Sequence, residues 1–218
     1  MTGHAVRSLA VVGSALALLA SCGEDDAPGF RVCEPGIVEV VSFTPGVGAG
    51  FGADRLPDIV QGPPDGGKTS EGSLSVLSLG IGGELVVRLG CEVTDGDGVD
   101  FVVAENPFLV GATGAAFVEP AEIAVSIDGA DFKVFPCTPP TSTVADDDGV
   151  DGCAGLSPVT ANADNGLAGV FPDGGGDGFD LGTIGVDRAV FMRVHDRSSG
   201  GSANNAGFDL DAITVRSY

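Results

Sequence analysis

Basic and aromatic residues are scarce in this chain. Its 218 residues include no Trp, one Tyr and two His, with 10 Lys and Arg against 31 Asp and Glu. Proteins that bind nucleic acid use Lys and Arg to neutralise phosphates, so this charge balance excludes a nucleic-acid partner. His195 is the only histidine beyond the N-terminal region, and the sequence has no GxSxG or HExxH motif. We therefore expect a protein that is not an enzyme.

A long apolar run is also missing. The longest one, Leu9–Ala20, is shorter than the roughly 20 residues that a transmembrane helix needs. It follows His4 and Arg7 and precedes small residues, which is the layout of a secretory signal peptide. We expect residues 1–21 to be a signal peptide.

The end of this run, Leu19-Ala20-Ser21-Cys22, resembles the lipobox of bacterial lipoproteins. The resemblance implies cleavage after Ser21 and lipidation of Cys22, with residues 22–36 as a tether to the membrane. Gly23 stands where Asp commonly signals inner-membrane retention, so we expect an outer-membrane or cell-surface location. An ordinary signal peptide followed by an incidental cysteine is the alternative.

Acidic residues and glycine are abundant. Without residues 1–21 the chain has nine Lys and Arg and a formal charge of −22, yet apolar residues make up 43% of the whole sequence. This is enough for a core, and 36 Gly with 13 Pro favour many turns over long helices. The many carboxylates would suit a hard cation, and we expect calcium as a cofactor.

Four cysteines remain once Cys22 is assigned to lipid. Their even number in an exported chain predicts two disulfides, for which three pairings are possible. We favour Cys137–Cys153, which closes one loop, and Cys33–Cys91, which ties the first strand to a sheet. The other two pairings stay open.

Hydrophobic residues alternate with period 2 along most of the chain beyond residue 36, which indicates strands. The clearest hairpin is Glu122–Phe135, where Asp128-Gly129 is expected to form a two-residue turn. The segment 137–187 is acidic and Gly-rich and is expected to form loops on one rim. The other predicted strands are 37–43, 74–79, 84–89, 100–105, 188–196 and 208–216.

This pattern predicts an all-β fold. Eight or nine strands with long Gly- and Asp-rich loops are typical of a β-sandwich. We expect residues 37–218 to form a single domain of this kind.

Three motifs resemble galactose-binding-like, discoidin-like jelly rolls. They are the hairpin residues Val125–Gly129 with Phe132, the strand Arg188–Val194, and the closing segment Gly207–Ile213. The order of these and other motifs across roughly 37–217 also resembles a group of uncharacterised secreted bacterial cell-surface proteins. The resemblance implies a jelly-roll β-sandwich. It leaves the function open, because this fold carries many functions.

A nucleotide site is not expected. Gly62–Thr69 matches the pattern GxxxxGK[ST], but two prolines stiffen it and the following residues do not begin a helix. We expect no nucleotide partner.

Carboxylates on the closing strand are the best metal-ligand candidates. Ile213 and Val215 should face the core, and the same parity turns Asp209 and Asp211 inward, where carboxylates must be paired or coordinate a metal. Asp95–Asp100 alternates carboxylates with glycines but is shorter than an EF-hand loop. The predicted calcium ligands are Asp209, Asp211, Asp100, Glu105, Asp177 and Asp180, in one site or two.

Together these features predict a lipid-anchored, exported cell-surface binding module that calcium stabilises. A glycan or a surface protein is the expected ligand, and the membrane is reached through the lipid. One alternative is a structural component of a surface assembly with no small ligand. A second is a polysaccharide-acting hydrolase that uses loop carboxylates.

Overall fold

A computed structural model describes residues 36–67, 72–111, 114–142, 144–145, 152–162, 164, 174–199 and 206–216. All of them belong to one compact unit, Cys33–Tyr218. Their regular elements are strands and short 3-10 helices, which confirms the predicted all-β class. The signal-peptide residues, Cys22 and Cys33 lie outside the described residues.

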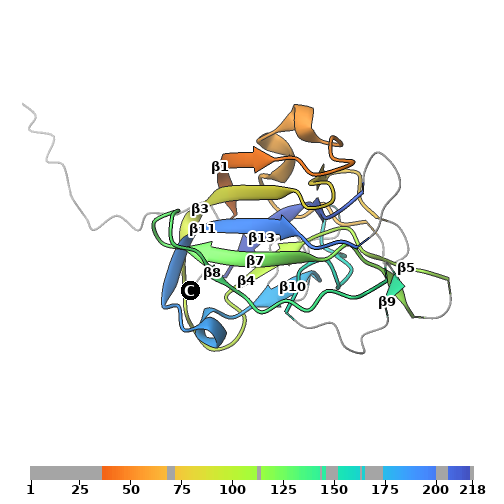
Figure 1. The fold of residues 1–218 in the computed structure, drawn as a ribbon. Helices are drawn as coiled ribbons and strands as arrows, with labels where there is room; N and C mark the ends of the chain where they lie inside the picture. The colour runs from red at the N-terminus through yellow and green to blue at the C-terminus, as the bar shows by residue number, and fades with distance from the viewer. Residues whose placement is uncertain are drawn as a thin grey trace, which may run out of the picture. The chain divides into compact units, whose positions relative to one another are not determined.

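The larger sheet has five antiparallel strands in the order β1-β3-β11-β7-β8. Figure 1 shows β1, β3, β11 and β7 side by side in one layer. The strands are β1 (Ile37–Thr44), β3 (Glu84–Thr94), β11 (Arg188–Asp196), β7 (Ala121–Ser126) and β8 (Lys133–Val134).

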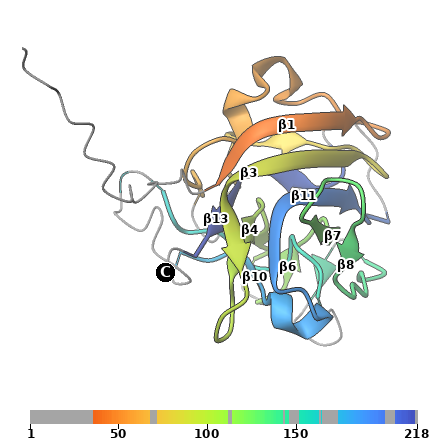
Figure 2. The same cartoon turned by 90° about the vertical axis from the view of Figure 1, so that its left-hand side faces the viewer.

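A second layer faces this sheet (Figures 1 and 2). Its three-stranded sheet has the order β10-β4-β13, and a two-stranded sheet pairs β12 with β2. The strands are β10 (Asp177–Phe179), β4 (Phe101–Ala104), β13 (Ala212–Val215), β12 (Asp209–Leu210) and β2 (Leu77–Ser78).

The remaining elements are short. A small sheet joins β5 (Phe108–Leu109), β6 (Ala116–Phe117) and β9 (Val144–Ala145), and the 3-10 helices are η1 (Ala53–Arg55), η2 (Asp58–Val60) and η3 (Leu181–Ile184). The described residues thus contain thirteen strands rather than eight or nine. The excess comes from strands of two or three residues, which are too short to show an alternating pattern.

The core lies between the two layers. Leu85, Val87 and Leu89 of β3 are fully buried, as their alternation predicts. From the other layer Phe101 stacks on Phe179, with ring centroids 5.2 Å apart. Phe135 meets both rings edge-on, at 5.8 and 5.0 Å. Three phenylalanines therefore supply the aromatic packing that the missing tryptophans cannot.

The segment 137–187 does more than form loops, which corrects the sequence-based expectation. Its residues Asp177–Phe179 form β10 and pair with β4, from Val103 to Phe101. Phe179 is buried there against Phe101, and this packing makes a strand favourable despite the Gly-rich surroundings.

The predicted hairpin is present, but its turn is longer than two residues. Val125 pairs with Lys133, so the connection runs from Ser126 to Phe132. The Ser126 hydroxyl accepts hydrogen bonds from the amides of Asp128 and Gly129, and the Asp128 carboxylate accepts from Ala130 and Asp131. These side-chain bonds stabilise a wider loop than a two-residue turn.

The Cys137–Cys153 disulfide is present, as predicted, with Cα atoms 4.7 Å apart. It fixes the segment after β8 close to Ala154, which exchanges two backbone hydrogen bonds with Ala121 at the start of β7. Cys91 is also disulfide-bonded. Its predicted partner, Cys33, lies outside the described residues.

Candidate functional site

The six predicted calcium ligands do not meet at one point. Asp209 and Glu105 lie together, and Asp100 lies with Asp180, at the other end of β4 from Glu105. Asp177 and Asp211 each lie elsewhere. All but the half-buried Asp180 are buried.

Glu105 and Asp209 belong to a buried carboxylate cluster with Glu119 and Asp196. Glu105 directly follows β4, Asp209 begins β12, Glu119 precedes β7 and Asp196 ends β11. Their exposed fractions are 3%, 9%, 7% and 3%. The Asp209 amide donates to Glu105 Oε1 at 3.3 Å, which ties β12 to the end of β4.

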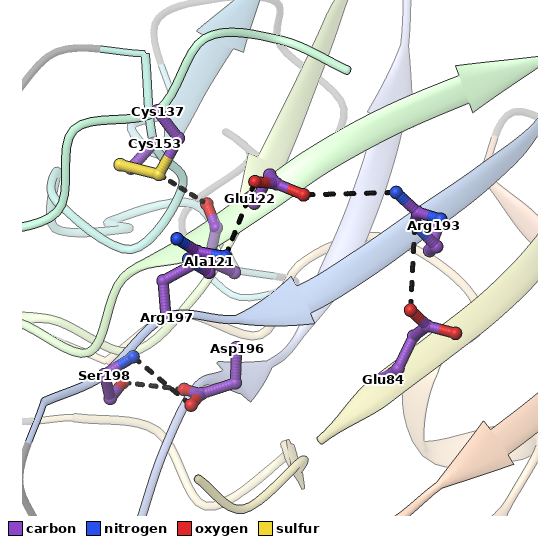
Figure 3. A network of polar contacts seen from close by, with 9 residues as sticks. All are labelled: Glu84, Ala121, Glu122, Cys137, Cys153, Arg193, Asp196, Arg197 and Ser198. Atoms are coloured by element: carbon purple, nitrogen blue, oxygen red, sulfur yellow. Dashed lines mark hydrogen bonds and ion pairs between the residues drawn. A yellow bond between two sulfur atoms is a disulfide. The ribbon is translucent and has the colours of Figure 1, made fainter. Parts of the chain in front are cut away.

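Asp196 is the hydrogen-bonded member of the cluster. Its carboxylate accepts from the amides of Gly82 and Phe208, each at 2.8 Å. It also accepts from the amide and the hydroxyl of Ser198, at 3.2 and 2.6 Å (Figure 3). Four donors therefore satisfy this carboxylate. Its negative charge contributes to the raised pKa of Glu119 and of Asp209.

The other three carboxylates are poorly compensated. Burial raises the pKa of Glu105 well above its usual range, and the charges of Asp209 and Glu119 add to the rise. Burial, then the charge of Asp209, raises the pKa of Glu119 to about 7, although the Gly207 amide donates to it at 2.8 Å. Burial also raises the pKa of Asp209.

Three buried oxygens in this cluster have no hydrogen-bond partner. They are Glu105 Oε2, Asp209 Oδ1 and the hydroxyl of Ser78, which is opposite Asp209 in the β2–β12 pair. The side chains of Ser78 and Asn106 lower the pKa of Asp209, but by less than burial raises it. The Ser78 hydroxyl is near Asp209 without making a well-formed hydrogen bond. A buried polar atom without a hydrogen-bond partner destabilises the folded protein. A ligand that contacts these three oxygens would remove that destabilisation.

No described Lys or Arg forms an ion pair with a carboxylate of this cluster. The arginines on and next to β11 pair with other carboxylates. Arg193 lies between Glu84 and Glu122, at 3.8 and 3.9 Å, and Arg197 lies 3.8 Å from Glu122 (Figure 3).

A second acidic group lies at the other end of β4. Asp95, Asp100 and Asp180 each place one oxygen so that all three oxygens lie within 4.8 Å of one another. The Asp100 carboxylate accepts from the amides of Gly96 and Leu181, at 3.0 and 2.9 Å. Asp180 caps η3, and its Oδ1 accepts from the Gly182 amide at 2.8 Å.

Asp177 and Asp211 bind backbone amides. Asp177 Oδ2 accepts from Gly155 and Leu156 at 2.7 and 2.9 Å. The Asp211 carboxylate accepts from the Asp65 amide at 3.0 and 3.2 Å. Burial raises the pKa of both, that of Asp211 to about 7 with a contribution from the Asp65 charge. Each has backbone donors that offset its burial.

A cavity of about 350 Å³ lies beside Asp180. Phe135, Phe179 and Pro136 are apolar lining residues, and Asp180 and Thr183 are polar ones. Val99, Gly152 and Gly178 complete the lining. Because Gly152 precedes Cys153 and Pro136 precedes Cys137, the disulfide frames one wall.

Sequence reasoning missed Glu119 and Asp196. Asp196 has the parity of Met192 and Val194, which are fully buried, so the argument that placed Asp209 inward would also have placed Asp196 inward. Glu119 stands alone between Val118 and Pro120, and an isolated acid in an apolar stretch is a signal of burial. Nothing in the sequence indicated that Glu119 and Glu105 would meet.

Comparison of the sequence with protein-family models and with curated proteins found no match. Among the described residues, no helix is long and apolar enough to cross a membrane. Fold and site therefore define the class of this protein by themselves: an all-β protein with layered antiparallel sheets, a buried carboxylate cluster at one end of β4 and a cavity near the other.

Proposed function

We propose that this protein is a lipid-anchored, exported surface module that binds a carbohydrate rather than transforming it. The observation that carries the proposal is the cavity beside Asp180, which has aromatic and apolar walls with few polar groups. Sites for small ligands commonly have this composition. The N-terminal sequence motifs support export and lipidation.

The lining suits a sugar. Pro136 is exposed and Val99 is half-buried, so these two side chains offer apolar surface to the C–H face of a pyranose ring. Phe135 and Phe179 also line the cavity, but each is only 4% exposed. The half-buried carboxylate of Asp180 can accept hydrogen bonds from ring hydroxyls. The Thr183 hydroxyl donates to the Asp180 carbonyl oxygen at 2.6 Å and can accept a hydrogen bond from the sugar. We propose that Asp180 fixes the orientation of the bound sugar.

Binding rather than hydrolysis is favoured by the carboxylates of the cavity. Glycoside hydrolysis needs two carboxyl groups that flank the bond. Among the described residues that line the cavity, Asp180 is the only acid, and Asp95 and Asp100 cluster with it.

A screen on a glycan array, followed by calorimetric titration with the best soluble oligosaccharide, tests this proposal. Asp180→Asn should weaken binding at least tenfold, because a neutral amide accepts weaker hydrogen bonds than a carboxylate. Asn also caps helices, so η3 should persist. Thr183→Val should weaken binding as well.

Asp187→Asn is the matched control, because it removes an equal charge from an exposed residue outside the lining. If the array shows no binding, or if Asp180→Asn and Asp187→Asn bind alike, the carbohydrate proposal is wrong. Calcium remains the proposed stabilising ion in either case, because the carboxylates of Glu105, Glu119 and Asp209 lie at the other end of β4 from this cavity.

A further inference from the structure

We infer that Glu105, Glu119 and Asp209, with Ser78, form a buried calcium site. The inference deepens the calcium part of the proposed function and does not depend on carbohydrate binding. Glu119 and Ser78 are ligands that the sequence did not indicate. Asp177 and Asp211 are not members of this cluster, and their carboxylates accept hydrogen bonds from the amides of Gly155 and Asp65 instead.

Three oxygens at this site lack hydrogen-bond partners. Glu105 Oε2, Asp209 Oδ1 and the Ser78 hydroxyl are buried and make no hydrogen bond. Ser78 and Asp209 are direct cross-strand neighbours in the β2–β12 pair, so their side chains lie on one face. Glu105 joins them through the bond from the Asp209 amide.

The buried carboxylates of this cluster repel one another. Glu105, Glu119, Asp209 and Asp196 are close enough for their charges to disfavour one another, and none of them forms an ion pair with a described Lys or Arg. Buried charges must be paired or coordinate a metal. Asp196 already accepts four hydrogen bonds, so we expect the cation to bind the other three carboxylates.

The chemistry of the donor atoms determines which ion suits the site. The donors are carboxylates and a hydroxyl, with no His or Cys, which selects a hard cation over a transition metal. Calcium tolerates irregular geometry at 2.3–2.6 Å, whereas Mg²⁺ requires a near-ideal octahedron at shorter distances.

A bound calcium would hold four segments together. Ser78 belongs to β2, Asp209 to β12, Glu105 follows β4, and Glu119 precedes β7 in the larger sheet. The ion would therefore join the two layers at this end of the sandwich, where Asp196 already ties β11 to Gly82 and Phe208 by hydrogen bonds.

The test compares the mature chain, stripped with chelator, in calcium, in magnesium and in chelator. At calcium about one hundred times Kd, the melting temperature should rise by about 5 to 10 °C. Calorimetry should give one calcium per chain at this site, and magnesium should give a smaller shift.

The double variant Glu105→Gln/Asp209→Asn should lose the calcium-dependent shift. Its melting temperature in chelator should equal or exceed that of the wild type, because neutral isosteres remove the repulsion while keeping the side-chain shape. Loss of the shift would then not reflect misfolding. Asp180→Asn, which alters the other acidic group and the sugar cavity, should keep the full shift.

Three results would overturn the inference. One is a wild type that melts alike in calcium and chelator. The second is a Glu105→Gln/Asp209→Asn variant that keeps the shift. The third is a shift lost in Asp180→Asn instead, which would place the ion at Asp95, Asp100 and Asp180. Glycan binding is measured in a separate experiment, so a protein that binds no glycan would still give a valid test of the calcium site.

Discussion

Asp211 shows how burial changes a carboxylate. It is 4% exposed, and the amide of Asp65 is its hydrogen-bond donor. Burial, with the nearby charge of Asp65, raises its pKa from 3.8 to about 7. The native protein therefore holds a proton on Asp211 at a pH where the unfolded chain has released it. The stability that this proton gives is present at low pH and is lost as the pH rises from about 4 to about 7.

Asp211→Asn should remove this pH dependence, because the amide stays neutral and keeps an oxygen for the Asp65 amide. Between pH 4.5 and pH 8 the wild type should lose about 3 kcal/mol of stability relative to the variant, because the loss is about 1.4 kcal/mol per pH unit from pH 4.5 up to the native pKa of about 7. Denaturant unfolding in chelator at several pH values measures the difference.

Asp128→Asn is the control for this experiment. The amides of Asp131 and Ala130 lower the pKa of Asp128 to about 2, so it titrates below the range tested. That variant should follow the pH profile of the wild type between pH 4.5 and pH 8. Parallel profiles for Asp211→Asn and the wild type would contradict the prediction.

At the scale of elements, the Cys137–Cys153 disulfide connects the start of β7 with two residues that line the cavity, Pro136 and Gly152. It joins the segment after β8 to Gly152 and Ala154, and Ala154 pairs with Ala121 at the start of β7. Gly152 itself has a φ of 71°, and a Cβ there would lie 1.9 Å from the Pro136 carbonyl oxygen. This tight contact makes glycine necessary beside the disulfide.

Replacing both cysteines, as in Cys137→Ser/Cys153→Ser, should lower the free energy of unfolding by about 3 kcal/mol, because the unfolded chain regains the entropy of an open loop. Guanidinium unfolding at fixed pH and calcium measures the loss. Sugar affinity should also fall, since Pro136 and Gly152 line the cavity.

Thiol titration of the unreduced, denatured mature protein provides an independent check on the disulfides. We expect no free thiol from Cys33, Cys91, Cys137 or Cys153. Two titratable thiols would contradict the prediction of a second disulfide that includes Cys33.

At the scale of the whole molecule, charge and apolar content act together. A formal charge of −22 beyond residue 21 favours a soluble, self-repelling surface, while the buried Leu, Val, Ile and Phe side chains fill one core between two layers. Such a surface would not adhere to anionic lipid by charge. A covalent lipid at Cys22 therefore remains the predicted route to the membrane.

Growth of the producing bacterium with labelled palmitate tests the anchor. The wild type should carry label, and Cys22→Ser should carry none while its folded domain keeps the same melting temperature. Fractionation should place the labelled protein in the outer membrane, as Gly23 predicts. Label on Cys22→Ser would refute lipidation at this residue, and recovery in the inner membrane would refute the placement alone.

The sequence by itself determined the all-β class and several strands. Residues 188–196 form β11 with the predicted bounds, and Leu85, Val87 and Leu89 of β3 are buried as their alternation predicts. It also indicated the Cys137–Cys153 disulfide and the burial of Asp209 and Asp211. These features depend on local periodicity or on one short loop, which a single chain displays directly.

The tertiary structure decided which carboxylates meet. Glu105 and Asp209 are 104 positions apart, and Gly207 reaches Glu119 across 88 positions, so their contacts depend on how β12, β4 and the segment before β7 assemble. It also decided that Asp100 and Glu105, which the sequence already placed at the two ends of one strand, belong to different carboxylate groups. Side-chain parity tells which face a residue occupies, but only long-range strand pairing sets its neighbours on that face.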